Sequence, residues 1–225
     1  AATRSGRAGA AAVAAAGALV AGCSSTAGGA GHAGESGVTP VAVTTVGDTT
    51  RLGDIPPGYG SLRQEDLSVS VRLPLVLVRL MPLDESVIRL LSPDSYRALR
   101  ELRDGHRDAI VRSAQRVGVE RPSLWYVSFF GLAPDARFTA RDVDVLSGGR
   151  DFRPLDVIPL TAGFGEETVG QRQVQSAIYV FAGGINPNQP LAIRVESRET
   201  TDWGAVIPII ERERALVRSR AAARP

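Results

Sequence analysis

Residues 68–81, with the sequence SVSVRLPLVLVRLM, decide the fold class of this chain. From Ser68 to Leu73 polar and apolar residues alternate, and this period of two is typical of a β-strand with one buried face. Pro74 removes a backbone donor, so the apolar run from Leu75 to Met81 is either a second strand or a kinked continuation of the first. Extended structure is therefore expected near the start of the folded domain.

Other stretches along the chain have the same character. Residues 124–130, LWYVSFF, are aromatic and β-branched, which favours a strand that is buried on both sides. Residues 142–146 alternate and end at the turn signal Ser147-Gly148-Gly149, so residues 153–160 are expected to pair with them as a hairpin. Further short strands are predicted at 87–91, 175–181 and 191–195.

Seven or eight short strands with turn residues between them predict a mainly β fold of the α+β class. Their spacing favours an antiparallel β-sandwich over a parallel sheet, and the pattern resembles that of immunoglobulin-like domains. This resemblance is one of pattern alone, and it implies nothing about function.

One strong helix is predicted among the strands, over residues 93–117. Ser92 is placed as the N-cap, Pro93 occupies the first helical position, and Gly118 suits the C-terminal cap. Gly105 lowers helix stability by about 1 kcal/mol relative to alanine and marks a place where the helix can bend. The apolar stripe consists of residues three or four apart: Tyr96, Leu99, Leu102, His106, Ile110, Ser113 and Val117.

The first 22 residues have the order of a secretory signal peptide. Arg4 and Arg7 precede an uncharged, alanine-rich stretch at 8–20, and small residues follow it. A helix over that stretch would span about 20 Å, which is shorter than the hydrocarbon core of a bilayer at about 30 Å. A cleaved export signal is therefore the stronger interpretation, and a permanent membrane span is the weaker one.

The segment Leu19-Val20-Ala21-Gly22-Cys23-Ser24 resembles the lipobox of bacterial lipoproteins. The resemblance implies that a signal peptidase recognises Val20, Ala21 and Gly22, that the chain is cut before Cys23, and that the Cys23 thiol is acylated. The implied location is the bacterial cell envelope. Because Ser24 follows the cysteine, this means the outer membrane where there are two membranes, and otherwise the outer face of the cell membrane. The alternative is an alanine-rich tail with an unrelated cysteine.

Composition excludes several kinds of chemistry for these 225 residues. All 26 basic residues are arginines, which excludes a lysine Schiff base and a P-loop lysine. The single cysteine excludes an intramolecular disulfide and a metal site made of several cysteines. Cleavage after residue 22 would remove two arginines and no acidic residue, which leaves 24 arginines against 24 acidic residues. The mature chain is close to neutral, so no nucleic-acid partner is expected.

The expected organisation has four parts: a signal peptide at 1–22, a flexible membrane tether at 23–64, the sandwich domain at 65–221 and a basic tail at 222–225. The tether is rich in Gly, Ala, Ser and Thr and cannot bury enough apolar surface to offset its chain entropy. A second helix is expected after Pro208, from Ile209 to about Arg220. The run 211–225, with five arginines and two glutamates, is either a basic surface for anionic lipid or an exposed helix with a basic end.

The residues that could carry catalysis lack partners in the sequence. His106 falls on the apolar stripe with no second histidine or cysteine in the folded region, so its expected role is a hydrogen bond to a backbone carbonyl. Asp142, Asp144 and Asp151 flank the predicted hairpin but lack the spacing of a calcium loop. They are expected on the polar outer face of an edge hairpin. No catalytic residue, metal or cofactor is predicted.

These observations favour a lipid-anchored, non-catalytic protein of the cell envelope over an enzyme. Its expected partners are the membrane, through lipidated Cys23, and an envelope protein or cell-wall component that it binds or whose assembly it stabilises. The alternative is an envelope module that binds a small ligand or an ion. A hydrolase that uses carboxylates alone is a weaker third possibility.

Overall fold

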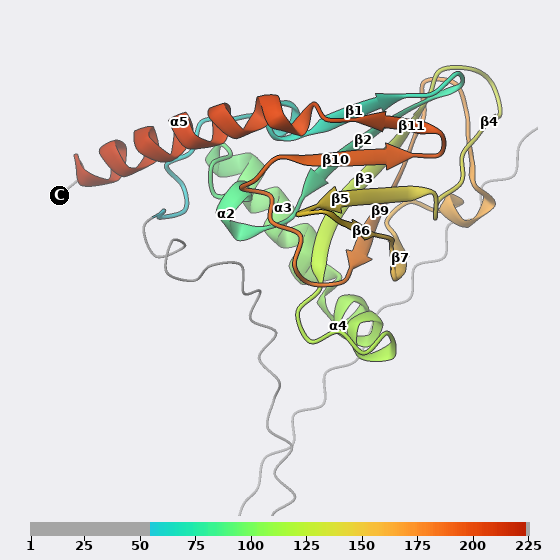
Figure 1. Cartoon of the computed structure of the whole chain (residues 1–225), viewed down its shortest axis with the longest axis horizontal. Coiled ribbons are helices and arrows are strands. Elements are labelled where there is room, and N and C mark those ends of the chain that lie inside the picture. Colours follow the sequence, from blue (N-terminus) through green and yellow to red (C-terminus); the bar gives the residue numbers. More distant parts are fainter. Residues whose placement is uncertain (1–54, 224–225) are drawn as a thin grey trace, which may run out of the picture. The chain divides into compact units, whose positions relative to one another are not determined.

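Two antiparallel sheets dominate the computed structural model, which describes residues 55–223 (Figure 1). The five-stranded sheet has the order β1 (Val69–Arg72), β2 (Val76–Pro82), β3 (Ser123–Gly131), β9 (Val174–Phe181) and β7 (Asp156–Pro159). The four-stranded sheet has the order β11 (Arg198–Thr200), β10 (Leu191–Val195), β5 (Val143–Ser147) and β6 (Arg150–Phe152). A small ladder pairs β4 (Ala136–Arg137) with β8 (Thr168–Val169).

The two larger sheets pack face to face and share one hydrophobic core. Their inward-facing side chains with no exposed surface include Val78, Leu80, Trp125, Val127, Phe129, Val143, Val145, Tyr179 and Ile193. The Tyr179 hydroxyl donates a hydrogen bond of 2.5 Å to the carbonyl oxygen of Ala140. Burial raises the pKa of Tyr179, so the hydroxyl stays protonated and remains a donor. The predicted α+β class and antiparallel sandwich are confirmed. The described residues form eleven strands and not the seven or eight expected, because strands of two or three residues show no sequence period.

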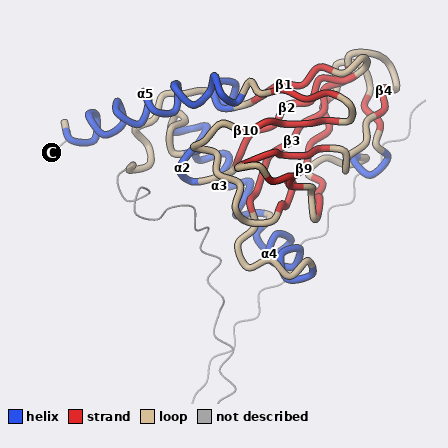
Figure 2. The backbone as a smooth tube through the Cα atoms, viewed as in Figure 1, coloured by secondary structure: helices blue, strands red, loops and turns tan. Residues whose placement is uncertain are grey.

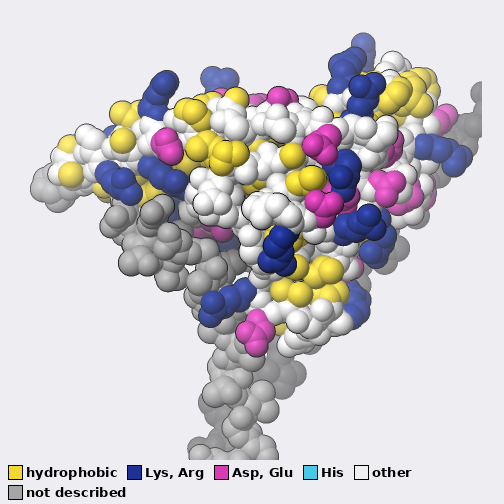
Figure 3. Space-filling view, viewed as in Figure 1, with side chains coloured by type: hydrophobic (Ala, Val, Ile, Leu, Met, Phe, Trp, Pro, Cys, Tyr) yellow, Lys and Arg dark blue, Asp and Glu magenta, His cyan; other side chains and the backbone are white. Residues whose placement is uncertain are grey.

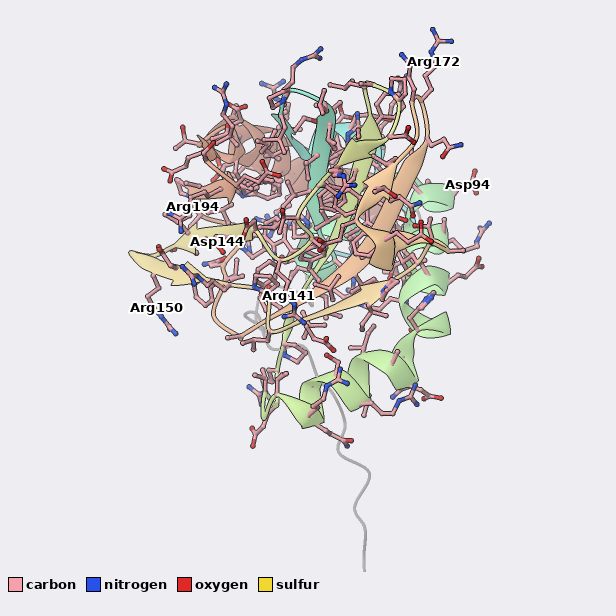
Figure 4. All side chains as sticks on the ribbon, turned by 90° about the vertical axis from the view of Figure 1, so that its right-hand side faces the viewer. Asp94, Arg141, Asp144, Arg150, Arg172 and Arg194 are labelled. Carbon is pink, nitrogen blue, oxygen red and sulfur yellow. The ribbon has the colours of Figure 1, made fainter. Side chains whose placement is uncertain are left out.

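Two helices, α3 (Pro93–Gly105) and α4 (Arg107–Arg116), cover part of the outer face of the five-stranded sheet (Figure 2). In the side view of Figure 4 these helices lie on one side of that sheet, and β5 and β6 lie on the other. Outer-face side chains beneath the helices are buried: Met81, Leu124, Ile178 and Val180. The helix layer ends before the turn between β1 and β2, and the outer-face side chains there are more exposed.

The helix predicted over residues 93–117 exists, but it is divided in two. Gly105 ends α3, and His106 has non-helical backbone angles (φ −107°, ψ 11°) before α4 begins. His106 Nδ1 lies 2.8 Å from the carbonyl oxygen of Leu102, which confirms its expected hydrogen bond. Gly118, with φ +69°, follows α4 and confirms the C-terminal cap.

The strand predicted at 87–91 is wrong, because these residues form a short helix and the turn after it. Helix α2 spans Glu85–Ile88, and the Asp84 side chain caps it by accepting a hydrogen bond of 2.8 Å from the Ser86 N–H. The fully buried side chains of this segment are Val87, Ile88, Leu90 and Leu91. A short run with so many buried positions shows neither the 3.6-residue period of a helix nor the two-residue period of a strand. The sequence pattern therefore could not distinguish helix from strand.

The hairpin predicted between residues 142–146 and 153–160 is also wrong. Strand β5 pairs with β6 across Gly148 and Gly149, which both have positive φ. The chain then crosses to the other sheet, where β7 pairs with β9. The hairpin of β5 and β6 still lies at the edge of its sheet, so the expected position of Asp144 and Asp151 on an edge hairpin holds, with β6 as the partner strand. Local alternation predicts a strand, but it does not predict the partner of that strand.

Residues 55–63, which the sequence assigns to the tether, pack on the domain. Ile55 is 2% exposed, and Leu62 forms a parallel bridge with Leu91. A Cβ on Gly60 would lie 2.3 Å from the backbone of Leu90, so this close approach requires glycine. The 3₁₀-helix η1 (Gln64–Leu67) then leads into β1.

The C-terminal helix α5 (Trp203–Ala222) begins earlier than predicted and includes Pro208. Proline removes one helical hydrogen bond, but the buried side chains of Trp203 and Val206 hold the first turns on the core. Ala222, assigned to the basic tail, is the last residue of this helix, and residues 224–225 lie outside the described range. Over residues 55–223, no helix combines the length and the hydropathy that crossing a bilayer requires.

Candidate functional site

The outward face of the four-stranded sheet carries a cluster of charged side chains. Alternation along β5 and β10 turns Val145 and Ile193 into the core and leaves Asp144 and Arg194 on the outer face. Asp144 and Arg194 are directly opposite each other in the antiparallel ladder, so their side chains meet. Figure 4 shows the two close together on the side of the molecule that carries β5.

Arg194 is the centre of this cluster. Its Nη2 donates to Asp144 Oδ2 at 2.7 Å and to Asp151 Oδ2 at 3.3 Å, and its Nε donates to the same Asp144 oxygen at 3.2 Å. Its Nη1 lies 3.9 Å from Glu199 Oε2. The hydrogen bonds with Asp144 and Asp151 raise the pKa of Arg194, which keeps the guanidinium charged. One arginine on β10 therefore contacts carboxylates from β5, β6 and β11.

An open hollow of about 480 Å³ lies beside Arg194. Its lining residues come from β5, β10 and the adjacent turns: Asp142, Asp144, Arg153, Arg194, Glu196 and Ser197. The backbone N–H of Glu196 donates to the carbonyl oxygen of Asp142 at 2.9 Å, which ties together two turns at the rim. Acidic and basic side chains are interleaved on this face in Figure 3.

This arrangement suits the binding of a polar partner. The central carboxylates and the guanidinium hold one another in place, so acceptors and donors have fixed positions before a partner arrives. Asp144 and Asp151 are brought together on one arginine, and Asp142 lines the hollow. In the part of the chain that the structure describes, no three His, Cys, Asp or Glu side chains come together as a metal site.

A second charged cluster joins α2 to α3. Glu85 accepts hydrogen bonds from Arg89 Nε at 2.9 Å and from Arg103 Nη2 at 2.7 Å, and the Tyr96 hydroxyl donates to it at 3.2 Å. Burial by itself raises the pKa of Glu85, but the two arginines more than offset this effect, so the pKa is lowered. Both carboxylate oxygens are engaged by neighbouring side chains, and the cluster serves to hold the helix layer together.

The sequence pattern indicates only part of the site. It singles out Asp142, Asp144 and Asp151 but misses Arg194, which organises two of them. The one available signal is the sequence LAIRV at 191–195, in which a charged residue alternates with buried ones. The pairing of β10 with β5 is needed to bring Arg194 to Asp144.

The other predicted site residues belong to the segment that resembles a lipobox. The lipobox residues all lie outside the described range: Val20, Ala21, Gly22 and Cys23. Comparison of the sequence with models of protein families gave no match, and searches of curated proteins and of solved structures likewise gave none.

Proposed function

We propose that the chain is a lipid-anchored, non-catalytic protein of the bacterial cell envelope, and that its sandwich domain binds another envelope macromolecule or stabilises an assembly. The observation that carries the binding role is the charged outer face around Arg194, with its ordered carboxylates and adjoining hollow. The lipobox resemblance at Val20 to Cys23 supports the anchor. The immunoglobulin-like character of the sandwich is part of the same proposal, supported by two antiparallel sheets around one core.

The charged face supports a macromolecular partner for a physical reason. Charged groups that are fixed in alternating positions give specificity, because a partner with the wrong charge pattern meets like charges or loses hydrogen bonds. Arg194 and Asp144 lie on neighbouring strands in the middle of the sheet, so no loop has to become ordered when a partner binds. Such a preorganised surface loses little entropy on association. The expected partner is a polar protein or cell-wall polymer.

The anchor is tested by replacing Cys23 with serine in the chain expressed with its own N-terminus in a bacterial host. The unmodified chain is expected in the membrane fraction, with a mass that reports cleavage before Cys23 and added acyl chains. The C23S variant is expected to carry no acyl chain and to lose detergent-dependent membrane association, because serine has no thiol to acylate. An unmodified chain found in the aqueous fraction with residues 1–22 attached would refute the anchor.

The binding face is tested by photocrosslinking in the same host. A photoreactive amino acid at Ser197, which lines the hollow, is expected to give a defined adduct with an envelope component. Arg194→Glu reverses the central charge and is expected to lower the adduct yield at least about tenfold. Arg97→Glu on α3, where the side chain is 66% exposed, is the matched control and should leave the yield unchanged. Equal yields from the two variants would remove Arg194 from the binding role.

A small-ligand module is the second candidate, and the volume of the hollow is the observation that favours it. About 480 Å³ falls within the range of small-molecule sites, which is roughly 300–1,000 Å³. A thermal-shift series with calcium, sugars and peptidoglycan fragments separates the two candidates. Stabilisation by calcium or by a sugar, lost in the R194E variant, would favour the ligand module, whereas stabilisation by peptidoglycan fragments alone would favour a cell-wall polymer as the partner.

A further inference from the structure

Three turns meet at the end of the five-stranded sheet that the helices leave uncovered. They are residues 73–75 between β1 and β2, residues 132–135 after β3, and residues 170–173 before β9. The backbone N–H of Leu132 donates to the carbonyl oxygen of Leu75 at 2.8 Å, and that of Arg172 donates to the carbonyl oxygen of Gly131 at 2.8 Å. We call these three hydrogen-bonded turns the tip of the sheet.

An apolar patch lies on the outer face of the sheet at the tip. Leu77 is directly opposite Phe130, and Phe130 is directly opposite Val174, so the three side chains form one row across β2, β3 and β9. Leu75 and Leu132 extend this row toward the tip. Leu75 and Val174 are each 48% exposed, and the other three are half-buried. The apolar patch is thus these five residues, all on the face that α3 and α4 cover elsewhere.

Arginines border the apolar patch. Arg72 is exposed and lies directly opposite Leu77 in the ladder of β1 and β2. Arg172 is exposed on the turn before β9 and points away from the domain (Figure 4). Residues 72–76, 131–137 and 170–174 together contain three arginines and one aspartate.

We infer that the tip is a membrane-contact surface for a bilayer that contains anionic lipid. The apolar patch enters the interfacial region, and Arg72 and Arg172 bind lipid phosphate groups at its border. Aliphatic and phenyl side chains next to arginine match the two layers of a lipid interface, and each basic residue near an anionic surface strengthens binding several-fold. The inference deepens the proposed function, since it gives an anchored domain a defined orientation on its membrane.

Chain length permits this contact together with the anchor. Ile55 lies 32 positions after Cys23, and a chain of that length reaches at most about 110 Å. A domain of roughly 170 residues has a radius of gyration of only about 15 Å. Cys23 and the tip can therefore contact the same bilayer, wherever residue 55 lies on the domain.

The test uses the full chain with Cys23→Ser, so that no acyl chain contributes, and sedimentation with vesicles. Vesicles of equal parts phosphatidylglycerol and phosphatidylcholine are expected to bind the protein more tightly than vesicles of phosphatidylcholine alone. Leu75→Ser combined with Val174→Ser is expected to lower the partition coefficient about tenfold. Arg72→Gln combined with Arg172→Gln is expected to lower it at least tenfold at low salt and to flatten its dependence on salt.

Leu155→Ser provides the matched control, because Leu155 is also an exposed leucine, at 37% exposure. It lies far from the tip, since its backbone N–H donates a hydrogen bond to the carbonyl oxygen of Val180, at the end of β9 opposite Val174. This variant should bind as the parent does. All the substituted side chains are exposed, so each variant is first shown to keep the thermal unfolding temperature of the parent. Equal binding by the parent and the tip variants would overturn the inference. A self-associated parent that Leu75→Ser turns into a monomer would also overturn it, in favour of a second copy as the occupant.

The outcomes separate this inference from the function on which it rests. Acylation of Cys23 and the photocrosslink beside Arg194 do not involve the tip. If both are found while tip variants bind vesicles normally, only the membrane-contact surface fails. If Cys23 carries no acyl chain while tip variants lose vesicle binding, the anchor fails and the surface stands.

Discussion

Replacing Trp203 with alanine is expected to lower the free energy of unfolding by about 4 kcal/mol, since removal of a fully buried tryptophan costs roughly 3–5 kcal/mol. The Trp203 side chain has no exposed surface, and its ring centre lies 6.0 Å from that of Trp125 on β3. Its Nε1 donates to the carbonyl oxygen of Pro187 at 3.0 Å. The substitution therefore opens a cavity between α5 and the sandwich and leaves a buried carbonyl without its donor.

Urea unfolding of the full chain at 25 °C measures this loss. Trp203→Phe keeps most of the apolar volume but loses the hydrogen bond, and a smaller cost of about 1–2 kcal/mol is expected. Ile209→Ala changes a partly exposed side chain on the same helix and should cost under about 1 kcal/mol. A cost for Trp203→Ala no greater than that of Ile209→Ala would mean that α5 does not pack on the core through this residue.

Replacing Glu213 with alanine is expected to cost about 2 kcal/mol, because a buried carboxylate and the hydrogen bonds it accepts are lost, while the Arg220 side chain, which is 39% exposed, stays solvated. Glu213 on α5 is 3% exposed. Its Oε1 accepts from the Ser61 N–H at 2.8 Å, from the Ser61 hydroxyl at 2.9 Å and from Arg220 Nη1 at 2.7 Å. Arg220 also donates to the carbonyl oxygen of Tyr59 at 2.8 Å. The carboxylate thus holds residues 59–61 on the helix.

Two measurements test the role of Glu213. Urea unfolding gives the free energy, and hydrogen exchange reports whether the Ser61 amide loses protection, as expected when its acceptor is removed. Glu211→Ala, two residues earlier and exposed, is the matched control and should change neither quantity. Full protection of the Ser61 amide in the Glu213→Ala variant would contradict the role of Glu213 in holding residues 59–61 on α5, even if the free energy of unfolding fell.

The strands that alternation predicts are those whose two faces meet different surroundings. In β1 and β10 every second residue is buried and the residues between are exposed or half-buried, so a period of two is visible in the sequence. The two-residue strands β4 and β8 and the three-residue strand β11 are too short to show any period. The apolar run at 87–91 is buried throughout most of its length, and its α2 helix could not be distinguished from a strand.

Strand partners are harder to predict, because they depend on contacts between distant segments. Strand β7 follows β6 in the sequence yet joins β9 in the opposite sheet. The same limit applies to the candidate site, where Arg194 meets an aspartate 50 residues earlier in the chain. The lipobox resemblance at residues 19–24 is a different kind of signal, because processing enzymes recognise a lipobox as a short sequence; that prediction depends on no knowledge of the fold, and it stays a prediction.

The edge strands of the two sheets determine how easily neighbouring copies could pair with them. On one side of the sandwich the edge strand β1 of one sheet contacts the edge strand β11 of the other, so these two edge strands cover each other. The other two edge strands are β6, with three residues, and β7, with four residues ending in Pro159. Short edge strands and a proline give a neighbouring molecule few backbone groups with which to continue the ladder. Many copies held close together on one surface would therefore resist polymerising into fibres.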